Sequence, residues 1–340
     1  MEITDDHINE TAAIYIEHIA KISKQKKPIV AIHCVTYNHG DYLREALEGF
    51  VMQQTTFPFV AIVHDDASTD NTAEVLREYA DKYPDIILPI FETENQHSKK
   101  TLGIIMKKAR DVTSAKYIAM CEGDDYWIDP LKLQKQVDYL ELNPNFSMCF
   151  HSANLKYEKG TKQNKILETN YDNLQQREYS IDEIHKSFIV PACSVLLKTE
   201  VWDKYRNDPN YFVSDNVLWT ACALCGRIFC FEDKMSVYRI NNNGWTGRNN
   251  KTRELRVSST KKWYLHYKAL RNNYPEVSTI QMFKNELKYA SKITYSDLKP
   301  LSNVIHNFKY FYDTYKYDYI KSLYSNIAIS IGYKIKKLWT

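Results

Sequence analysis

The feature that most constrains the fold of this chain is an alternation of strand-like and helix-like segments from residue 29 to residue 142. Short apolar runs are typical of buried strands, and apolar residues at helical spacing are typical of amphipathic helices. This alternation predicts an α/β fold with a mainly parallel, Rossmann-like sheet and helices on both of its faces. The expected strands are residues 29–35, 59–63, 86–91 and 117–121, and the expected helices are residues 42–52, 72–83, 102–109 and 131–142.

The pattern is less regular outside this region. Apolar residues at helical spacing predict a short amphipathic helix within residues 7–22. Beyond Trp245 the chain becomes basic, rich in tyrosine and helical in its pattern. Between these parts we expect a polar loop or excursion at 155–180, a strand at 189–197, a helix at 217–224, and strands at 228–231 and 235–240.

Composition narrows the class of protein. The 340 residues carry a formal net charge of +3, which gives no argument for nucleic acid as a partner. The seven cysteines are odd in number and scattered, as is typical of a reduced, cytosolic chain. No signal peptide is visible at the start, and no apolar stretch is long enough to span a bilayer. We therefore expect a cytoplasmic protein.

Three carboxylates crowd the turn between the fourth expected strand and the helix that follows it. They are Glu122, Asp124 and Asp125. Because like charges repel at this spacing, the cluster is costly unless a cation or hydrogen-bond donors offset it. Ligands of open α/β sheets bind outside the carboxyl ends of the strands, where this turn lies. The turn therefore suits a divalent metal that carries a phosphorylated substrate, and an acidic turn that only caps the next helix is the alternative.

Two earlier turns of the same kind follow the first and second expected strands. Asp65 and Asp66 end the second strand directly, where helix capping does not explain them, and a carboxylate there can accept from a base edge or a ribose hydroxyl. Tyr37 follows the first strand with a ring suited to stacking on a base, flanked by Thr36 and Asn38. Each turn alone is more often structural, but three together at the same edge favour a nucleotide site.

A glycine-rich phosphate loop is missing from the sequence. Neither Gly-x-Gly-x-x-Gly nor Gly-x-x-x-x-Gly-Lys-Ser/Thr is present. A diphosphate bound here needs another source of positive charge. A hard divalent ion held by carboxylate oxygens supplies it, so we expect Mg²⁺ or Mn²⁺ in preference to zinc.

Taken in order, these motifs resemble those of the family 2 glycosyltransferases. The matching segments are Ile-His-Cys-Val-Thr-Tyr-Asn-His at 32–39, Val-His-Asp-Asp-Ala-Ser-Thr-Asp at 63–70 and Glu-Gly-Asp-Asp-Tyr-Trp at 122–127. The resemblance covers about residues 28–245, and it is strongest to bacterial members that build surface polysaccharides such as capsule or lipopolysaccharide. It implies a GT-A fold, a nucleotide-sugar donor, a divalent metal, and inversion at the anomeric carbon by direct displacement.

The resemblance also assigns roles to residues at the nucleotide side of the site. It places Thr36 and Tyr37 at the nucleotide pocket, with Asn38 beside them, and Asp66 on the base. It places Asp124 near the ribose and makes Asp125 the metal ligand. UDP is the expected nucleotide by resemblance alone.

Three further residues complete the expected site. Asp215 matches the family's catalytic base, which takes the proton of the acceptor hydroxyl, although capping of the following helix explains an Asp there equally well. Trp127 is a candidate face for stacking on a sugar. Arg239 is a candidate contact of the diphosphate, and a core-edge role is the alternative. Many relatives carry a histidine soon after a Tyr-Arg pair, whereas here Tyr238 and Arg239 lead to Asn241.

Alternatives to this interpretation come from two other classes. A metal-dependent nucleotidyltransferase or phosphohydrolase also uses clustered carboxylates, but a nucleotidyltransferase more often has a glycine-rich, basic loop near its first strand. A catalytically silent nucleotide-sugar-binding partner is the third class, and it would be favoured by the loss of Asp125 or Asp215, which are both present.

The expected organisation has three parts. Residues 1–27 form an N-terminal helical extension, and residues 28–245 form the GT-A domain, with a nucleotide-sugar half at 28–130 and an acceptor half at 131–245. Residues 246–340 form a basic, helical C-terminal region. Its aromatic, isoleucine-rich and lysine-rich end fits peripheral contact with the inner face of an anionic membrane, as suits a lipid-linked acceptor. A helix packed on the catalytic domain, or a dimer contact, is the alternative.

Overall fold

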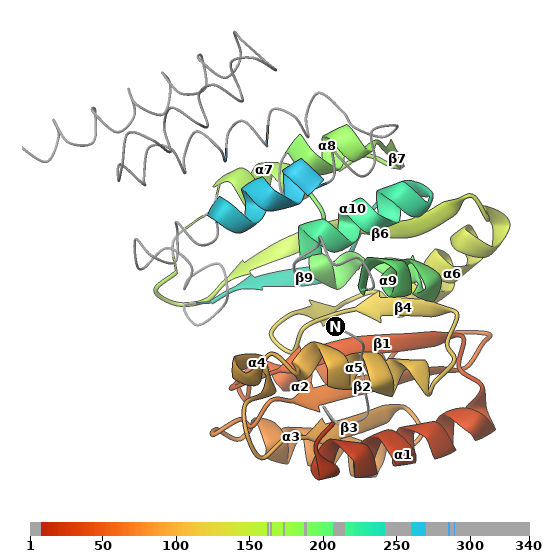
Figure 1. Ribbon diagram of the computed structural model, residues 1–340, viewed down its shortest axis with the longest axis vertical. Helices are drawn as coiled ribbons and strands as arrows, with labels where there is room; N and C mark the ends of the chain where they lie inside the picture. The colour runs from red at the N-terminus through yellow and green to blue at the C-terminus, as the bar shows by residue number, and fades with distance from the viewer. Residues whose placement is uncertain are drawn as a thin grey trace, which may run out of the picture. The chain divides into compact units, whose positions relative to one another are not determined.

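The computed structural model describes residues 8–161, 163, 165–172, 174–186, 189–206, 215–241, 260–269, 285 and 289 (Figure 1). The chain divides into two compact units. The first unit contains the sheet and comprises residues 1–180, 187–207 and 218–241. The second unit comprises residues 181–186, 208–217 and 242–340. Of the expected C-terminal helical region, residues 260–269 are helical, and the end of the chain from 290 to 340 lies outside the described residues.

The first half of the sheet is parallel, as the alternation predicts. Its strands lie in the order β3 (Ile87–Phe91), β2 (Phe59–Asp65), β1 (Val30–Thr36) and β4 (Tyr117–Met120), seen from bottom to top in Figure 1. β1 pairs in parallel with β2 and β4, and β2 pairs in parallel with β3. The register sets Thr36 beside Asp65, so the turns that follow β1 and β2 begin side by side.

Helices cover both faces of this half, as predicted. Residues at alternating positions of a strand point to opposite faces, so Ile32 and Ala31 of β1 enter different cores. Ile32 packs in the core that includes residues of α2 (Leu43–Val51), α3 (Thr72–Lys82) and α6 (Lys132–Leu142). Ala31 packs in the core that includes residues of α1 (Glu10–Lys26) and α5 (Leu102–Asp111).

The second half of the sheet is mixed and departs from the predicted elements. β8 (Leu196–Lys198) pairs antiparallel with β4, and the order continues through β6 (Phe146–Tyr157), β9 (Arg227–Ile240) and β5 (Tyr126–Trp127). β7 (Arg177–Tyr179) pairs with β9. The two expected strands at 228–231 and 235–240 are therefore wrong as separate elements, because they form the single strand β9.

The physical reason for that difference lies in the pairing of β6 with β9. The register between them shifts near His151 and Ser152 of β6, and the three residues 232–234 of β9 are exposed there. Such irregularities let a strand continue through a polar interruption. Of the two alternatives for 155–180, a simple loop is wrong, because the segment contains the end of β6, α7 (Lys165–Asp172) and β7.

Shorter elements complete the described structure. They are α4 (Gln96–Lys99), α8 (Ile181–Lys186), the 3₁₀ turn η2 (Ala192–Ser194), α9 (Thr199–Arg206) and α10 (Asp215–Cys225). The expected strand at 189–197 is mostly η2 and the start of β8.

The N-terminal helix α1 belongs to the same compact unit as the sheet. Ile16 and Ile19 are buried in its contact with the sheet, and full burial of such a side chain contributes roughly 1.5–3 kcal/mol. Asn9 caps the helix through a bond from the backbone N–H of Ala12 (2.8 Å), and its amide also donates to Glu92 (2.8 Å). This helix is therefore anchored at its first turn and along one face.

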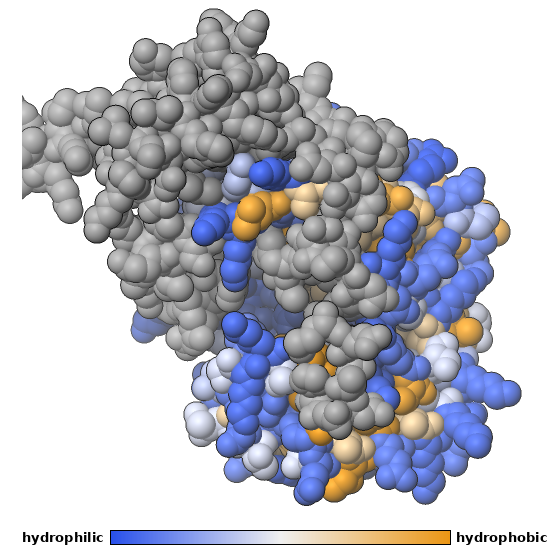
Figure 2. Space-filling model, in the orientation of Figure 1, coloured by the Kyte–Doolittle hydropathy of each residue, from blue (hydrophilic) through white to orange (hydrophobic). Residues whose placement is uncertain are grey.

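The described surface carries few large exposed apolar side chains. They are Ile14, Ile128, Leu131, Leu142 and Leu265. Among the coloured residues of Figure 2, hydrophilic side chains are common and hydrophobic ones lie between them. Over the described ranges, none of the helices combines the length and the apolar character that a membrane crossing requires.

Candidate functional site

The turns after β1 and β2 are joined into one hydrogen-bonded structure. The backbone N–H of Asp66 donates to the carbonyl of Thr36 (3.0 Å), and the N–H of Asn38 donates to Ser68 Oγ (2.9 Å). In return, Asn38 Oδ1 accepts from the N–H of Thr69 (2.8 Å). Asn38 itself has φ 55°, in the left-handed region that Asn tolerates better than most residues. The two turns predicted to bind the nucleotide therefore form a single surface.

Asp66 is placed within this surface but is already engaged. Its carboxylate accepts from the backbone N–H groups of Gln96 (2.6 Å) and His97 (3.1 Å), so it caps the short helix α4. The residue is 2% exposed. Tyr37, the expected stacking residue, is partly exposed. The base contact of Asp66 stays a prediction, since a carboxylate has further lone pairs for a ligand.

The acidic turn after β4 lies directly against the end of β1. A Cβ added to Gly123 would lie 2.6 Å from Thr36 Oγ1 and 3.0 Å from His39 Nδ1, so this approach requires glycine. Next to it, Asp124 Oδ2 accepts from Asn241 Nδ2 (2.8 Å) and lies 4.0 Å from His39 Nε2. The acidic turn and the joined turns of β1 and β2 thus form one candidate site.

Thr36 adds a polar group to the floor of this site. Its hydroxyl is fully buried and has no hydrogen-bond partner among the residues that the structure describes. Such orphaned groups are uncommon in folded proteins and call for an explanation such as a water or a ligand.

Asp125 is the buried member of the acidic pair. It is 4% exposed, and its Oδ1 accepts from the backbone N–H of Arg239 (2.7 Å). Burial, together with the negative charge of Asp124, raises the pKa of Asp125 well above its ordinary value. The side chain predicted to hold the metal therefore faces the backbone of β9, whereas the side chain of Asp124 is 18% exposed.

The side chains around Asp124 are of types that bind a hard divalent ion, but they are too few to coordinate it alone. The raised pKa of Asp125 beside the charge of Asp124 favours a cation, and carboxylate, amide and imidazole groups lie around Asp124. Within the described ranges, no group of three or more His, Cys, Asp and Glu residues has the geometry of a metal site. A metal at Asp124 would accordingly take other ligands from the donor and from water.

Two residues predicted to contact the donor are core residues in the structure. Trp127 is 2% exposed, and its indole N–H donates to the carbonyl of Cys193 (2.8 Å), which leaves no ring face for a sugar. Arg239 is 4% exposed, and its guanidinium forms ion pairs with Glu45 and Glu158. The core-edge alternative for Arg239 therefore describes it better than a diphosphate contact does.

Asp215, the expected base, is the first residue of α10. A carboxylate in the first turn of a helix interacts favourably with the helix N-terminus. By the division of the chain, Asp215 belongs to the second unit and Asp124 to the first. The role of Asp215 as a base stays a prediction.

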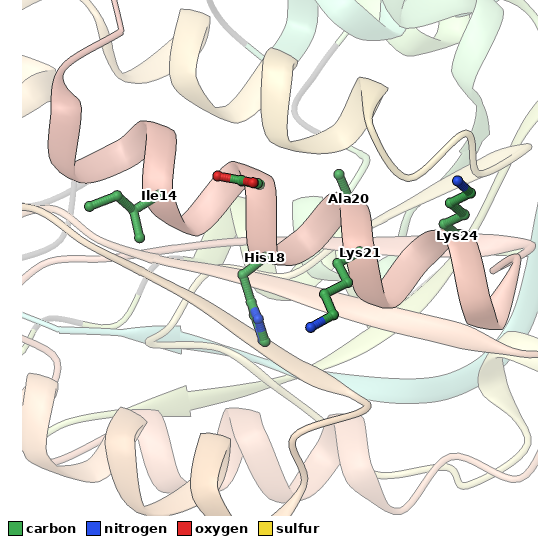
Figure 3. A pocket seen from close by; sticks show the side chains of 6 residues that line it. Ile14, His18, Ala20, Lys21 and Lys24 are labelled. Atoms are coloured by element: carbon green, nitrogen blue, oxygen red, sulfur yellow. The ribbon is translucent and has the colours of Figure 1, made fainter.

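Two surface pockets of the described residues lie apart from Asp124, which lines neither of them. One is lined by Ile14, Glu17, His18, Ala20, Lys21 and Lys24, all from α1 (Figure 3). Because no second element lines it among these residues, it carries no functional assignment. The other is formed between α2 and the segment Tyr126–Ile128, beside the acidic turn.

Comparison with known proteins agrees with this arrangement. The model of "Glycosyl transferase family 2" matches residues 31–203, and the chain belongs to this family. The uncharacterized protein Rv1520 of Mycobacterium tuberculosis is 36% identical over 216 residues, which cover 63% of this chain and 60% of that protein. The chain thus matches less than two thirds of the length of that relative.

Solved structures show that the fold is GT-A. The mannosyltransferase PcManGT from Pyrobaculum calidifontis, in complex with GDP-Man and Mn²⁺, aligns with a TM-score of 0.54 and 18% identity over 99% of this chain and 92% of that one. TarS 1-349 of S. aureus, in complex with UDP-GlcNAc, aligns with a TM-score of 0.52 and 14% identity over 88% of this chain and 91% of that one.

Some residues of the site carry weaker signals in the sequence. His39 follows the first strand without metal-ligand spacing, and Asn241 stands near the place where relatives carry histidine. Glu45 has the sequence signature of a solvated helix position, and Glu158 falls in the expected polar loop. The contacts of these residues arise where β9 and α2 approach the acidic turn, and no local sequence pattern predicts that approach.

Proposed function

We propose that the protein is an inverting glycosyltransferase that moves a sugar from a nucleoside-diphosphate donor to a hydroxyl of a glycan or lipid-linked acceptor. The observation that supports it most is the position of Asp124. Its carboxylate lies at the end of β4, bonded to Asn241 and near His39, in the same site as the joined turns of β1 and β2. Ligands of open α/β sheets bind at this edge.

We assign the metal of this reaction to Asp124 in preference to Asp125. One carboxylate oxygen of Asp125 accepts a hydrogen bond from the backbone of β9, and the residue is buried. The side chain of Asp124, in contrast, is partly exposed. Mn²⁺ or Mg²⁺ bound there would neutralise the diphosphate leaving group as a Lewis acid. The Mn²⁺ in the PcManGT complex supports a divalent ion as the expected cofactor.

The donor is proposed to be a UDP-sugar. Tyr37, Asn38 and Asp66 are the residues proposed to bind the nucleotide, since they lie on the joined turns. The two structural neighbours carry UDP-GlcNAc and GDP-Man, so nucleotide sugars as a class have more support than UDP in particular.

The acceptor part of the proposed reaction needs a base. Asp215 is proposed as the base that takes the proton of the acceptor hydroxyl, because a hydroxyl is a poor nucleophile until that proton is removed. The acceptor class is proposed from the resemblance to polysaccharide-building relatives, and peripheral contact with a membrane is proposed from the aromatic, isoleucine-rich and lysine-rich end of the chain.

A thermal-shift screen tests the proposal. The protein is heated with UDP, GDP or dTDP in the presence of Mn²⁺, Mg²⁺ or EDTA. A ligand at 100 times its dissociation constant stabilises the folded state by about 2.7 kcal/mol. We expect one nucleotide to raise Tm with metal and to lose this effect with EDTA. No shift with any nucleotide would contradict the proposal.

A further inference from the structure

Arg239 stands at a junction of four elements of the first unit. It lies near the end of β9, it is 4% exposed, and its side chain is 2% exposed. Its contacts reach the acidic turn, α2, the residue that follows β6, and the backbone of β9 itself. Nothing in the proposed chemistry uses this buried cation, so its role needs a separate explanation.

The first set of contacts fixes the acidic turn to β9. The backbone N–H of Arg239 donates to Asp125 Oδ1 (2.7 Å), and its side-chain Nε donates to the backbone carbonyl of Asp124 (2.7 Å). β5 extends the same contact, because Tyr126 pairs with Val237 in an antiparallel ladder. The turn is thus held by backbone and side-chain bonds from one residue.

The second set of contacts fixes the guanidinium itself. One terminal nitrogen pairs with Glu45 of α2, and the other pairs with Glu158. The guanidinium carbon lies 4.6 Å from the ring centroid of Tyr42 and 5.3 Å from that of Tyr126. Both terminal nitrogens are therefore paired and two aromatic rings lie close to the planar group, which is a set of contacts that lysine cannot reproduce.

We propose that Arg239, Glu45 and Glu158 form a positioning triad that sets the orientation of Asp124 for the metal and the diphosphate. This inference rests on the proposed function. The triad acts through the backbone of Asp124 and touches neither donor nor metal. Side chains that orient metal ligands in this way typically change metal affinity 10- to 100-fold when they are removed.

The chain offers a matched control on the same helix. Arg44 is adjacent to Glu45 on α2, and it forms a two-bond ion pair with Glu78 of α3 (2.7 and 2.6 Å). This pair is exposed and does not reach the acidic turn. Glu78→Gln removes an ion pair of the same kind from α2 without changing the triad.

The test compares Glu158→Gln, Glu45→Gln and their combination with Glu78→Gln in the full chain. Mn²⁺ binding in the presence of UDP or GDP is followed by electron paramagnetic resonance, together with Tm. Hydrogen exchange of the peptide 121–128 is measured without ligand. We expect the triad variants to weaken Mn²⁺ binding about tenfold or more and to speed exchange in the turn, and Glu158→Asp to restore part of both. Glu78→Gln should stay within about twofold of wild type.

Two results would overturn the triad. If the Gln variants lower Tm but leave Mn²⁺ affinity within about twofold of wild type, the contacts only stabilise the fold. If Arg239→Lys weakens UDP binding even in EDTA while both Glu variants bind normally, the guanidinium contacts the diphosphate instead. A wild type that binds no nucleotide with metal would contradict the proposed function, and turn exchange alone would then decide whether the triad positions Asp124.

Discussion

Arg239 and Lys132 are both cations buried in the first unit, but their surroundings differ in charge. Arg239 is paired with two carboxylates, Glu45 and Glu158. Lys132 is 0% exposed, and its ammonium donates to Gln136 Oε1 (2.6 Å) and lies 4.2 Å from the ring centroid of Trp127. Throughout the described ranges, no carboxylate forms an ion pair with it.

The pKa directions follow this difference. Burial lowers the pKa of Lys132 to about 8, because the surrounding thiols and the charge of Asp129 offset only part of the cost of burying its ammonium. Burial also acts to lower the pKa of Arg239, but the hydrogen bonds that its guanidinium donates to Glu158 and Glu45 outweigh this effect and raise the pKa. The charge of Arg239 is thus stabilised by two carboxylates, whereas the charged form of Lys132 is destabilised by burial.

The largest expected effect is the removal of the compensated cation. Arg239→Gln removes the guanidinium that pairs with Glu158 and Glu45, while Glu45 keeps its ion pair with Lys156 (3.1 Å). Breaking a buried pair in this way costs about 3 kcal/mol, at the low end because the carboxylates are partly exposed. The free energy of unfolding from urea denaturation measures the change. If the free energy of unfolding falls by less than it does on loss of the exposed pair Arg44–Glu78, the cluster does not behave as a buried ion triad.

The lowered pKa of Lys132 predicts that the stability of the protein depends on pH. Its folded pKa of about 8 lies below the value of 10.5 for an exposed lysine, so the unfolded state binds more protons between these values. Stability from this group is therefore lowest below pH 8 and rises by up to about 3 kcal/mol as pH increases toward 10.5. Unfolding curves of wild type minus those of Lys132→Met isolate this rise, and a flat difference would contradict it.

At pH 7 the same substitution should be neutral or stabilising. Methionine fills a similar volume without a charge, and such replacements of buried charges often stabilise by about 1–3 kcal/mol. The loss of the bond to Gln136 offsets part of this gain. Thermal unfolding of Lys132→Met at pH 7 provides the measurement, and a marked drop in Tm would mean that the ammonium stabilises the core.

The smallest expected effect belongs to the exposed pair of Arg44 and Glu78. Water solvates both side chains, so Glu78→Gln should lower the free energy of unfolding only slightly, and the loss should diminish in high salt. Urea denaturation at low and high salt would reveal it. A loss as large as that of Arg239→Gln would remove the distinction between exposed and buried cations.

The first half of the fold was predictable because its elements are local. Strands such as β1 and β2 are short apolar runs buried on both faces, and the helices between them carry clear apolar stripes. β6 was missed because buried polar residues, including His151 and Ser152, interrupt its apolar pattern. β9 was divided because its exposed middle has the sequence signature of a turn.

The acidic turn was predictable for the same reason, but the burial of each of its side chains was not. Asp124 and Asp125 are adjacent in sequence, and only the approach of β9 decides which carboxylate is buried. The same approach turns Arg239 from a candidate phosphate contact into the partner of Glu45 and Glu158. Long-range pairing of this kind leaves no periodic signal in the chain.

The most direct test of the account is a titration of Mn²⁺ into the protein with saturating UDP or GDP, for wild type and Asp124→Asn. The account predicts that wild type binds Mn²⁺ and that Asp124→Asn loses this binding by about 100-fold or more, because a removed ligand costs at least as much as the loss of an outer partner. Binding of Mn²⁺ to Asp124→Asn with wild-type affinity would contradict the account.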